Sequence, residues 1–403
     1  MKLRRLMMFV ILGCVTFFLS ISLSIVMAAT QPIPAENLSA YEWDLPQWLP
    51  KPIVPEDNPM SNEKVKLGRR LFYETRLSVT GDFSCAKCHQ QALAFTDGKP
   101  VAMGATGEVH PRNSMSLTNI AYSPVLTWAN PLMRKLEEQL LVPLFGEHPV
   151  EMGMVGREQE IITMLGDDSE YSRMFAAAFS GEEKPISIRN LAKAIASFER
   201  TLISANSPYD RYRYGGDTSA ISDSAKRGEV LFNSERLECF HCHGGFNFSD
   251  SIMHERLAFQ EMAFHNTGLY NIDGKGAYPP NNTGIYEITQ DPSQIGHFKA
   301  PTLRNIELTA PYMHDGSIGT LEEVIDHYAA GGRTISSGKY AGVGSENPLK
   351  SIFVSGFKLT EGERKDLLAF LRSLTDEEFI HNQALSPVEN KLSSLDRSSY
   401  ANE

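Results

Sequence analysis

Four of the chain's five cysteines occur in two copies of one pattern, Cys-x-x-Cys-His. The first copy reads CAKCH at residues 85–89 and the second reads CFHCH at residues 239–243. In this pattern two thiols lie close together on a helical turn, where they can bond the vinyl groups of a porphyrin, and the adjacent histidine can bind its iron. The sequence therefore predicts two covalently bound c-type haems, attached through Cys85, Cys88, His89, Cys239, Cys242 and His243.

A zinc site and a redox-active dithiol are the alternatives for these motifs. Zinc usually takes four ligands from one compact module, whereas these motifs stand far apart in the chain, at 85–89 and 239–243. Haem attachment also explains why an exported protein would have no disulfide. Four cysteines lie in the two motifs and the fifth, Cys14, lies in an apolar leader, so no thiol is left for a disulfide in the mature chain.

The ligand on the far side of each iron decides its function. An iron with two strong protein ligands carries electrons, whereas an iron with an open or weakly held face can bind peroxide. After the second motif, residues 321–328 place Leu321, Val324, Ile325 and Tyr328 on one helical face. Tyr328 is then either a core residue or a phenolate ligand to the second iron, with Met313, His314 and His327 as rivals. The residues available to close the first iron are Met103, His110 and Met115.

The elements that position these residues are mostly helical. Apolar spacing and capping residues predict helices over 63–72, with Asn62 as N-cap, and over 131–142, 157–165, 169–180, 187–204, 222–232, 317–330 and 360–374. Residues 244–320 are rich in Gly, Asn and Pro and predict long loops. Before each motif stands a similar helix, VKLGRRLF at 65–72 and AKRGEVLF at 225–232, whose glycine allows close helix packing. We expect a mainly α fold with little β, in which two cytochrome c-like haem domains pack around an inter-domain interface.

The chain divides into five predicted segments. Residues 1–28 read as an export signal, with a basic start, an apolar run and Val26-Met27-Ala28 at the cleavage site. An uncleaved membrane anchor and a lipoprotein signal ending at Cys14 are the alternatives, and all three place the folded part outside the cytoplasm. The other segments are a Pro-rich arm (29–60), an N-terminal domain with the peroxide-binding haem (61–215), a C-terminal domain (216–380) and a disordered tail (381–403). We therefore expect a periplasmic protein.

Composition excludes two broad classes of protein. Of 403 residues 42% are hydrophobic, too many for a mainly disordered chain. The 38 Lys and Arg are outnumbered by 49 Asp and Glu, for a net charge of −11, which argues against a polybasic nucleic-acid binder.

The run APTLRNIELTAPYMHDG at 300–316 resembles the second-domain loop of the bacterial di-haem cytochrome c peroxidase and MauG family, and the likeness extends over nearly the whole mature chain. It places Tyr328 where ordinary peroxidases of the family carry a methionine ligand, and tyrosine there marks the MauG-like branch. It also assigns Trp128 to the tryptophan between the haems, Gln139, Pro143 and Glu151 to the distal pocket, and Asn113, Thr309 and Pro311 to a calcium site.

Within that family, HPRNSMSL at 110–117 and CFHCHGGFNFSD at 239–250 resemble the MbnH-type enzymes, which oxidise a tryptophan of a partner protein, MbnP. The resemblance implies that peroxide binds at the iron held by His89, with Glu151 as general acid–base and Gln139 as hydrogen-bond donor. It implies that Trp128 relays electrons to a second iron whose tyrosinate ligand favours the high-valent state.

Two other functions stay open. One is a cytochrome c peroxidase fed by small electron-donor proteins, and the other is a pure electron carrier. His110 is a departure from the family pattern: it is either a ligand that swings away or, as we expect, a solvent-exposed side chain.

Overall fold

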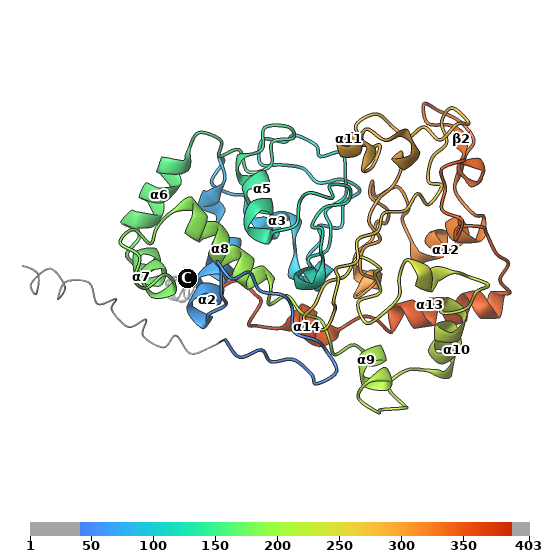
Figure 1. The fold of residues 1–403 in the computed structure, drawn as a ribbon, viewed down its shortest axis with the longest axis horizontal. Coiled ribbons are helices and arrows are strands. Elements are labelled where there is room, and N and C mark those ends of the chain that lie inside the picture. The colour runs from blue at the N-terminus through green and yellow to red at the C-terminus, as the bar shows by residue number, and fades with distance from the viewer. Residues whose placement is uncertain (1–40, 389–403) are drawn as a thin grey trace, which may run out of the picture. The chain divides into compact units, whose positions relative to one another are not determined.

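Two crossed helix pairs frame the two halves of the fold. In the computed structural model, which describes residues 41–388, α2 (Asn62–Phe72) packs on α8 (Ile188–Glu199), and α10 (Asp223–Phe232) packs on α13 (Glu361–Arg372) (Figure 1). A methyl group at Gly68 would collide with the carbonyl oxygen of Ala194, and one at Gly228 with that of Asp366. The predicted role of these two glycines in close helix packing is therefore confirmed.

The remaining elements are short. The other α-helices are α3 (Cys85–Cys88), α4 (Leu136–Gln139), α5 (Leu141–Phe145), α6 (Glu158–Asp167), α7 (Ser169–Ala178), α9 (Pro208–Arg213), α11 (Tyr286–Thr289), α12 (Leu321–Ala329) and α14 (Glu377–His381). Single 3₁₀ turns cover Thr75–Leu77, Gln91–Leu93, Ile120–Tyr122, Cys239–His241, Pro292–Gln294, Ile306–Leu308 and Gly344–Glu346. Within residues 41–388 the sheet consists of two antiparallel strands, β1 (Thr334–Ile335) and β2 (Gly342–Val343). The mainly helical fold is as predicted.

Where helix boundaries differ from the prediction, local chemistry explains them. Ser61, one residue before the expected Asn62, caps α2 by accepting from the Lys64 amide. The single helix expected over 131–142 is two short helices, because Pro143 has no N–H to continue the α4 ladder. Thr320 starts α12 later than expected through a capping box with Glu323.

Buried apolar side chains gather in two clusters. The first includes Leu67, Leu71, Phe72 and Phe198 from the α2–α8 pair. The second includes Phe232 and Phe370 from the α10–α13 pair, together with Phe248. Tyr209 belongs to the second cluster and Phe379 to the first. The predicted domain boundary between residues 215 and 216 stays a prediction.

The two ends of the described chain lie against its body. Residues 41–60 of the predicted Pro-rich arm have no helix before α2, and Trp48 stacks on Tyr214 with ring centroids 4.1 Å apart. The disorder expected from residue 381 is wrong for 381–388: Leu385 is buried, and the Tyr73 hydroxyl donates to its carbonyl at 2.7 Å. An apolar contact and a hydrogen bond hold this segment although its composition is polar. The rest of the tail and the predicted export signal lie outside the described residues.

None of the helices within residues 41–388 is long and apolar enough to span a membrane.

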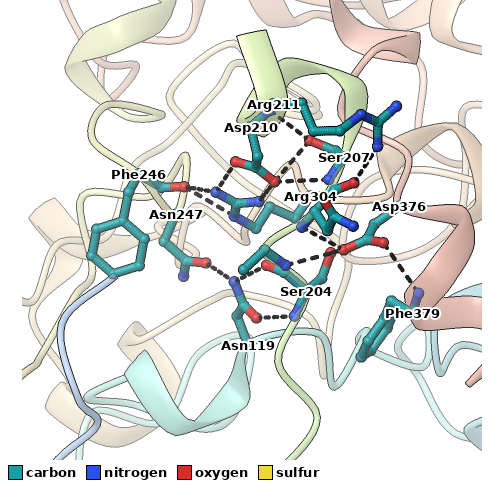
Figure 2. Close-up of polar contacts among 12 residues, drawn as sticks. Asn119, Ser204, Ser207, Asp210, Arg211, Phe246, Asn247, Arg304, Asp376 and Phe379 are labelled. Atoms are coloured by element: carbon teal, nitrogen blue, oxygen red, sulfur yellow. Dashed lines mark hydrogen bonds and ion pairs between the residues drawn. The ribbon is translucent and has the colours of Figure 1, made fainter. Parts of the chain in front are cut away.

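A buried polar network joins segments distant in the sequence (Figure 2). Arg304 makes a bidentate ion pair with Asp210, with distances of 2.8 and 2.9 Å, and also donates to the carbonyl of Phe246. Asn119 donates to Asn247, and the Ser204 hydroxyl donates to Asp376. The network holds the loop after the second haem motif against α9 and the segment before α14.

Candidate haem-binding sites

In each motif, a hydrogen bond from Nδ1 to a main-chain carbonyl orients the histidine ring. His89 donates from Nδ1 to the carbonyl of Phe95 at 2.9 Å, and His243 donates from Nδ1 to the carbonyl of Phe248 at 3.0 Å. Both phenylalanines adopt the left-handed backbone conformation, with φ of 61° and 49°, which turns their carbonyls toward the rings. These bonds fix the tautomer that leaves each Nε2 free to bind a metal.

Burial lowers the pKa of both His89 and His243, which favours the neutral imidazole that metal binding requires. With two thiols beside each ring, both motifs fit a covalently bound haem. These two phenylalanines could not be identified from the sequence, because they orient the rings through main-chain carbonyls, which every residue has.

A large cavity adjoins the second motif. It is lined by Cys239, Cys242 and His243, and its empty volume is about 1610 Å³, which includes space open to solvent. Thr96 and Met115, which follow the first motif, also line it, so the cavity extends from the second motif toward the first.

The predicted apolar face of α12 lines this cavity. Leu321, Val324, Ile325 and Tyr328 all contribute to its wall. Tyr328 is half-buried, and its hydroxyl makes no hydrogen bond to any residue of the described chain. Burial raises the pKa of Tyr328, so a bound cation would be needed to ionise it.

The rivals of Tyr328 differ in position. His327 is not among the residues that line the cavity, and neither of its ring nitrogens has a partner in the described chain. Met313 and His314 do line the cavity. The His314 ring is stacked flat on Phe298, with centroids 3.6 Å apart.

Glu151 is a buried acid near the first motif. Burial alone raises its pKa to about 7, and its charge is sensed by both Cys85 and Cys88. A carboxyl group with a pKa near neutrality can both accept and return a proton at physiological pH. The structure therefore places this carboxyl group near the cysteines of the first motif.

The other predicted distal residues are brought together only in part. The Pro143 carbonyl accepts the Met152 amide at 2.8 Å, which brings Pro143 next to Glu151. Gln139 is half-buried at the end of α4, and no hydrogen bond within residues 41–388 joins its side chain to Glu151.

Trp128 is hydrogen-bonded to residues from both halves of the chain. It lines the cavity, and its indole N–H donates to the carbonyl of Asn113 at 2.9 Å. The main-chain amide of Lys299 in turn donates to the Trp128 carbonyl at 2.9 Å. The tryptophan is thus held by one residue from the N-terminal half and one from the C-terminal half of the chain.

Oxygen atoms gather around the predicted calcium ligands. The side-chain Nδ2 of Asn113 donates to the carbonyls of Lys99 at 2.7 Å and Pro311 at 3.5 Å. The Thr309 hydroxyl instead donates to Ile306. Carbonyl and amide oxygens are ligands that calcium takes, and Lys99 is a donor that the sequence did not single out.

The residues considered for closing the first iron are spread out. Met115 lines the cavity, whereas Met103 is 44% exposed. His110 was expected to be exposed and is half-buried instead, because its Nδ1 is turned inward to accept the Arg112 amide at 3.1 Å.

Two buried charged groups near these sites were missed by sequence reasoning. Lys299 is 5% exposed and lines the cavity. Glu199, at the end of α8, is 4% exposed, and burial raises its pKa to about 8. Glu199 lies in a helix and Lys299 in a loop, and at both positions the sequence pattern predicts an apolar residue or an exposed one. Only the folded structure shows that these two side chains are buried.

Comparison with known proteins gives several close matches. Residues 62–219 match the family described as "Di-haem cytochrome c peroxidase". The methylamine utilization protein MauG of Methylorubrum extorquens is 34% identical over 325 residues, covering 80% of this chain and 81% of that protein. The cytochrome-c peroxidase IdrP1 of Pseudomonas sp. strain SCT is 35% identical over 357 residues, covering 85% of this chain and 88% of that protein.

Solved structures agree with the sequence matches. The crystal structure of a MauG-like protein associated with microbial copper homeostasis superposes with a TM-score of 0.84 at 50% identity, covering 86% of this chain and 99% of the other. The diheme peroxidase BthA from Burkholderia thailandensis shares the fold at a TM-score of 0.61 and 21% identity, covering 83% of this chain and 91% of the other.

Proposed function

Because this chain belongs to the di-haem cytochrome c peroxidase and MauG family of peroxide-dependent oxidoreductases, we propose that it uses hydrogen peroxide to oxidise a tryptophan on a partner protein. The observation that carries this proposal is the position of Tyr328. Its side chain lines the same cavity as His243, and its hydroxyl makes no hydrogen bond within residues 41–388. An anionic oxygen ligand stabilises oxidised iron, whereas a thioether stabilises the reduced state.

Each haem would be held by its motif: Cys85, Cys88 and His89 for the first, Cys239, Cys242 and His243 with Tyr328 for the second. When bound, the haems supply the iron that peroxide oxidises. The protein's own contribution at the first site is proton transfer. Glu151, with a pKa of about 7, accepts a proton from the peroxide oxygen nearer the iron and returns it to the departing oxygen.

Trp128 is the proposed electron relay between the two sites. It lines the cavity of the second site and is hydrogen-bonded to Asn113. Calcium would be held by Asn113, Thr309 and Pro311. Because the Asn113 carbonyl also accepts the indole N–H, bound calcium would keep that carbonyl in place. Gln139 and Pro143 complete the wall of the peroxide site in this proposal.

The oxidised residue of the partner need not enter a pocket, because electrons can be removed from it over a distance through the relay. A partner of the MbnP type fits this chemistry. The likeness to a MauG-like protein associated with microbial copper homeostasis supports the choice. The predicted export signal supports a periplasmic location for both proteins.

A second function is favoured by a specific observation. Relatives of similar identity include peroxidases, such as the cytochrome c551 peroxidase of Pseudomonas aeruginosa at 31% identity over 267 residues, 66% of this chain and 72% of that protein. In that case small redox proteins would supply the electrons that reduce peroxide. Pure electron transfer, the third possibility, would require strong ligands on both irons.

The experiment that separates these functions uses the purified holoenzyme. We expect peroxide to produce near-infrared absorption, and to convert a tryptophan of an added MbnP-type protein to kynurenine, detected by mass spectrometry. Rapid peroxide turnover with reduced cytochrome c, without kynurenine, would establish the peroxidase function instead. A low-spin resting spectrum with no peroxide reaction would establish an electron carrier.

A further inference from the structure

The side chain of Lys299 is buried without a counter-charge. It is 5% exposed, and within residues 41–388 no carboxylate lies at ion-pair distance from its Nζ, whose partners are a hydroxyl and a main-chain carbonyl. Burying an amine without an acidic partner costs stability unless hydrogen bonds satisfy it.

All the hydrogen bonds of Lys299 go to one loop. Its Nζ donates to the Ser123 hydroxyl at 3.0 Å and to the Val125 carbonyl at 2.7 Å. Its main-chain amide donates to the Trp128 carbonyl at 2.9 Å. One residue of the C-terminal half therefore binds three residues of the segment that carries the proposed relay.

That loop lacks regular secondary structure, although Val125 and Leu126 are buried and the Leu126 amide donates to the Met133 carbonyl at 3.0 Å. Residues 123–128 form neither helix nor strand, so their backbone lacks the regular ladder that fixes a side chain's direction. On its other side the Trp128 indole is held by the Asn113 carbonyl, and the Asn113 amide donates to His314 at 2.9 Å. Trp128 is therefore held by the main-chain amide of Lys299 and by Asn113, while the Lys299 side chain holds Ser123 and Val125 earlier in the same loop.

We propose that Lys299 is a positioning residue, which holds Trp128 in the orientation required for electron transfer between the two haem sites. The inference rests on the proposed relay role of Trp128. A displacement of about 1 Å in a reacting group can cost about a hundredfold in rate, so loosening the loop that carries Trp128 would slow the relay without touching either haem motif.

Lys64 provides a matched control. It is also buried, at 7% exposed, and its Nζ also donates to one side-chain oxygen and one main-chain carbonyl, those of Asn58 and Pro59. Lys299→Met and Lys64→Met each leave two acceptors without their donor, so both variants should lose similar stability. Only Lys299 contacts the Trp128 loop.

The test uses holoenzyme with Trp43→Phe and Trp48→Phe, in which Trp128 is the one remaining tryptophan of the three. The first readout is the ultraviolet resonance Raman band that reports the indole N–H hydrogen bond. We expect Lys299→Met to shift and broaden this band, and Lys64→Met to leave it unchanged. The second readout is the near-infrared absorption after peroxide, which we expect Lys299→Met to reduce about tenfold or more.

An unchanged indole band in Lys299→Met would overturn the proposal. If that variant does not fold, Ser123→Ala removes one acceptor of Nζ without leaving a buried cavity, and we expect a smaller shift of the same band; no shift would again overturn it. If the parent protein gives no near-infrared absorption, the proposed function fails, and the Raman comparison still decides whether Lys299 positions Trp128.

Discussion

The main-chain amide of Met152 donates to the carbonyl of Pro143 at 2.8 Å, and this bond anchors the main chain next to Glu151. Burial raises the pKa of the Glu151 carboxyl group to about 7. The catalytic form is the carboxylate, because it must first accept a proton from peroxide. We therefore expect the peroxide reaction to accelerate about tenfold per pH unit below pH 7 and to level off above it.

Glu151→Gln should remove this pH dependence and slow the reaction by about 10²–10⁴-fold. Stopped-flow spectroscopy of the holoenzyme across pH 5–9 measures both effects. Glu147→Gln, an exposed neighbour, is the control and should behave as the wild type. A wild-type rate that is flat across this range, or a fully active Glu151→Gln variant, would refute the assignment.

Calcium removal should act on Trp128 through Asn113. Treating the holoenzyme with a chelator frees the oxygens around Asn113, whose carbonyl accepts the indole N–H at 2.9 Å. We expect the near-infrared absorption after peroxide to fall and calcium to restore it. Magnesium should not restore it, because magnesium demands a tight octahedral shell. Purified protein without bound calcium, by elemental analysis, would exclude this site.

Glu199 makes folding stability depend on pH. Its folded pKa of about 8 lies above the ordinary value of 4.5, so folding binds a proton between these values. Its contribution is therefore complete below about pH 4.5 and is lost as pH rises toward 8, with a slope of at most about 1.4 kcal/mol per pH unit.

Glu199→Gln should accordingly become more stable relative to the wild type as pH rises from 5 to 8. Urea unfolding of the holoenzyme at several pH values measures this difference. The exposed Glu158→Gln variant should show no such trend. A constant difference for Glu199→Gln would mean that the acid is ionised in the folded protein.

Breaking the buried ion pair of Asp210 and Arg304 should be costly. Both side chains are almost fully buried, at 2% and 1% exposed. Asp210→Asn leaves an uncompensated guanidinium, and we expect a loss of about 3–5 kcal/mol of unfolding free energy. Glu138→Gln, which breaks the exposed pair with Lys135, should cost less than about 1 kcal/mol. Equal losses in thermal or urea unfolding would contradict the structural role of the network.

The parts of the site that are defined by a fixed spacing of residue types along the chain could be predicted from the sequence. The two Cys-x-x-Cys-His motifs, the apolar face of α12 that carries Tyr328, and the glycines at the two helix crossings each follow from local patterns. Local spacing determines these features because one helical turn or one close contact defines them.

Features that depend on long-range contacts could not be predicted. The carbonyls of Phe95 and Phe248 orient the histidines, and Lys99 offers an oxygen near Asn113, through main-chain atoms that every residue has. The burial of Lys299 and Glu199 arises from packing between distant segments. The order of residues 382–388 likewise depends on partners about 300 positions earlier, Arg69 and Tyr73.

The central claim is that the phenolate of Tyr328 binds the second iron, and resonance Raman spectroscopy of the ferric holoenzyme tests it most directly. Excitation in a phenolate-to-iron charge-transfer band should enhance ring vibrations of a bound tyrosinate. These bands should vanish in Tyr328→Phe and persist in His327→Gln, whose side chain lies outside the cavity wall. Wild-type protein without tyrosinate bands, or with the signature of methionine or histidine at that iron, would contradict the account.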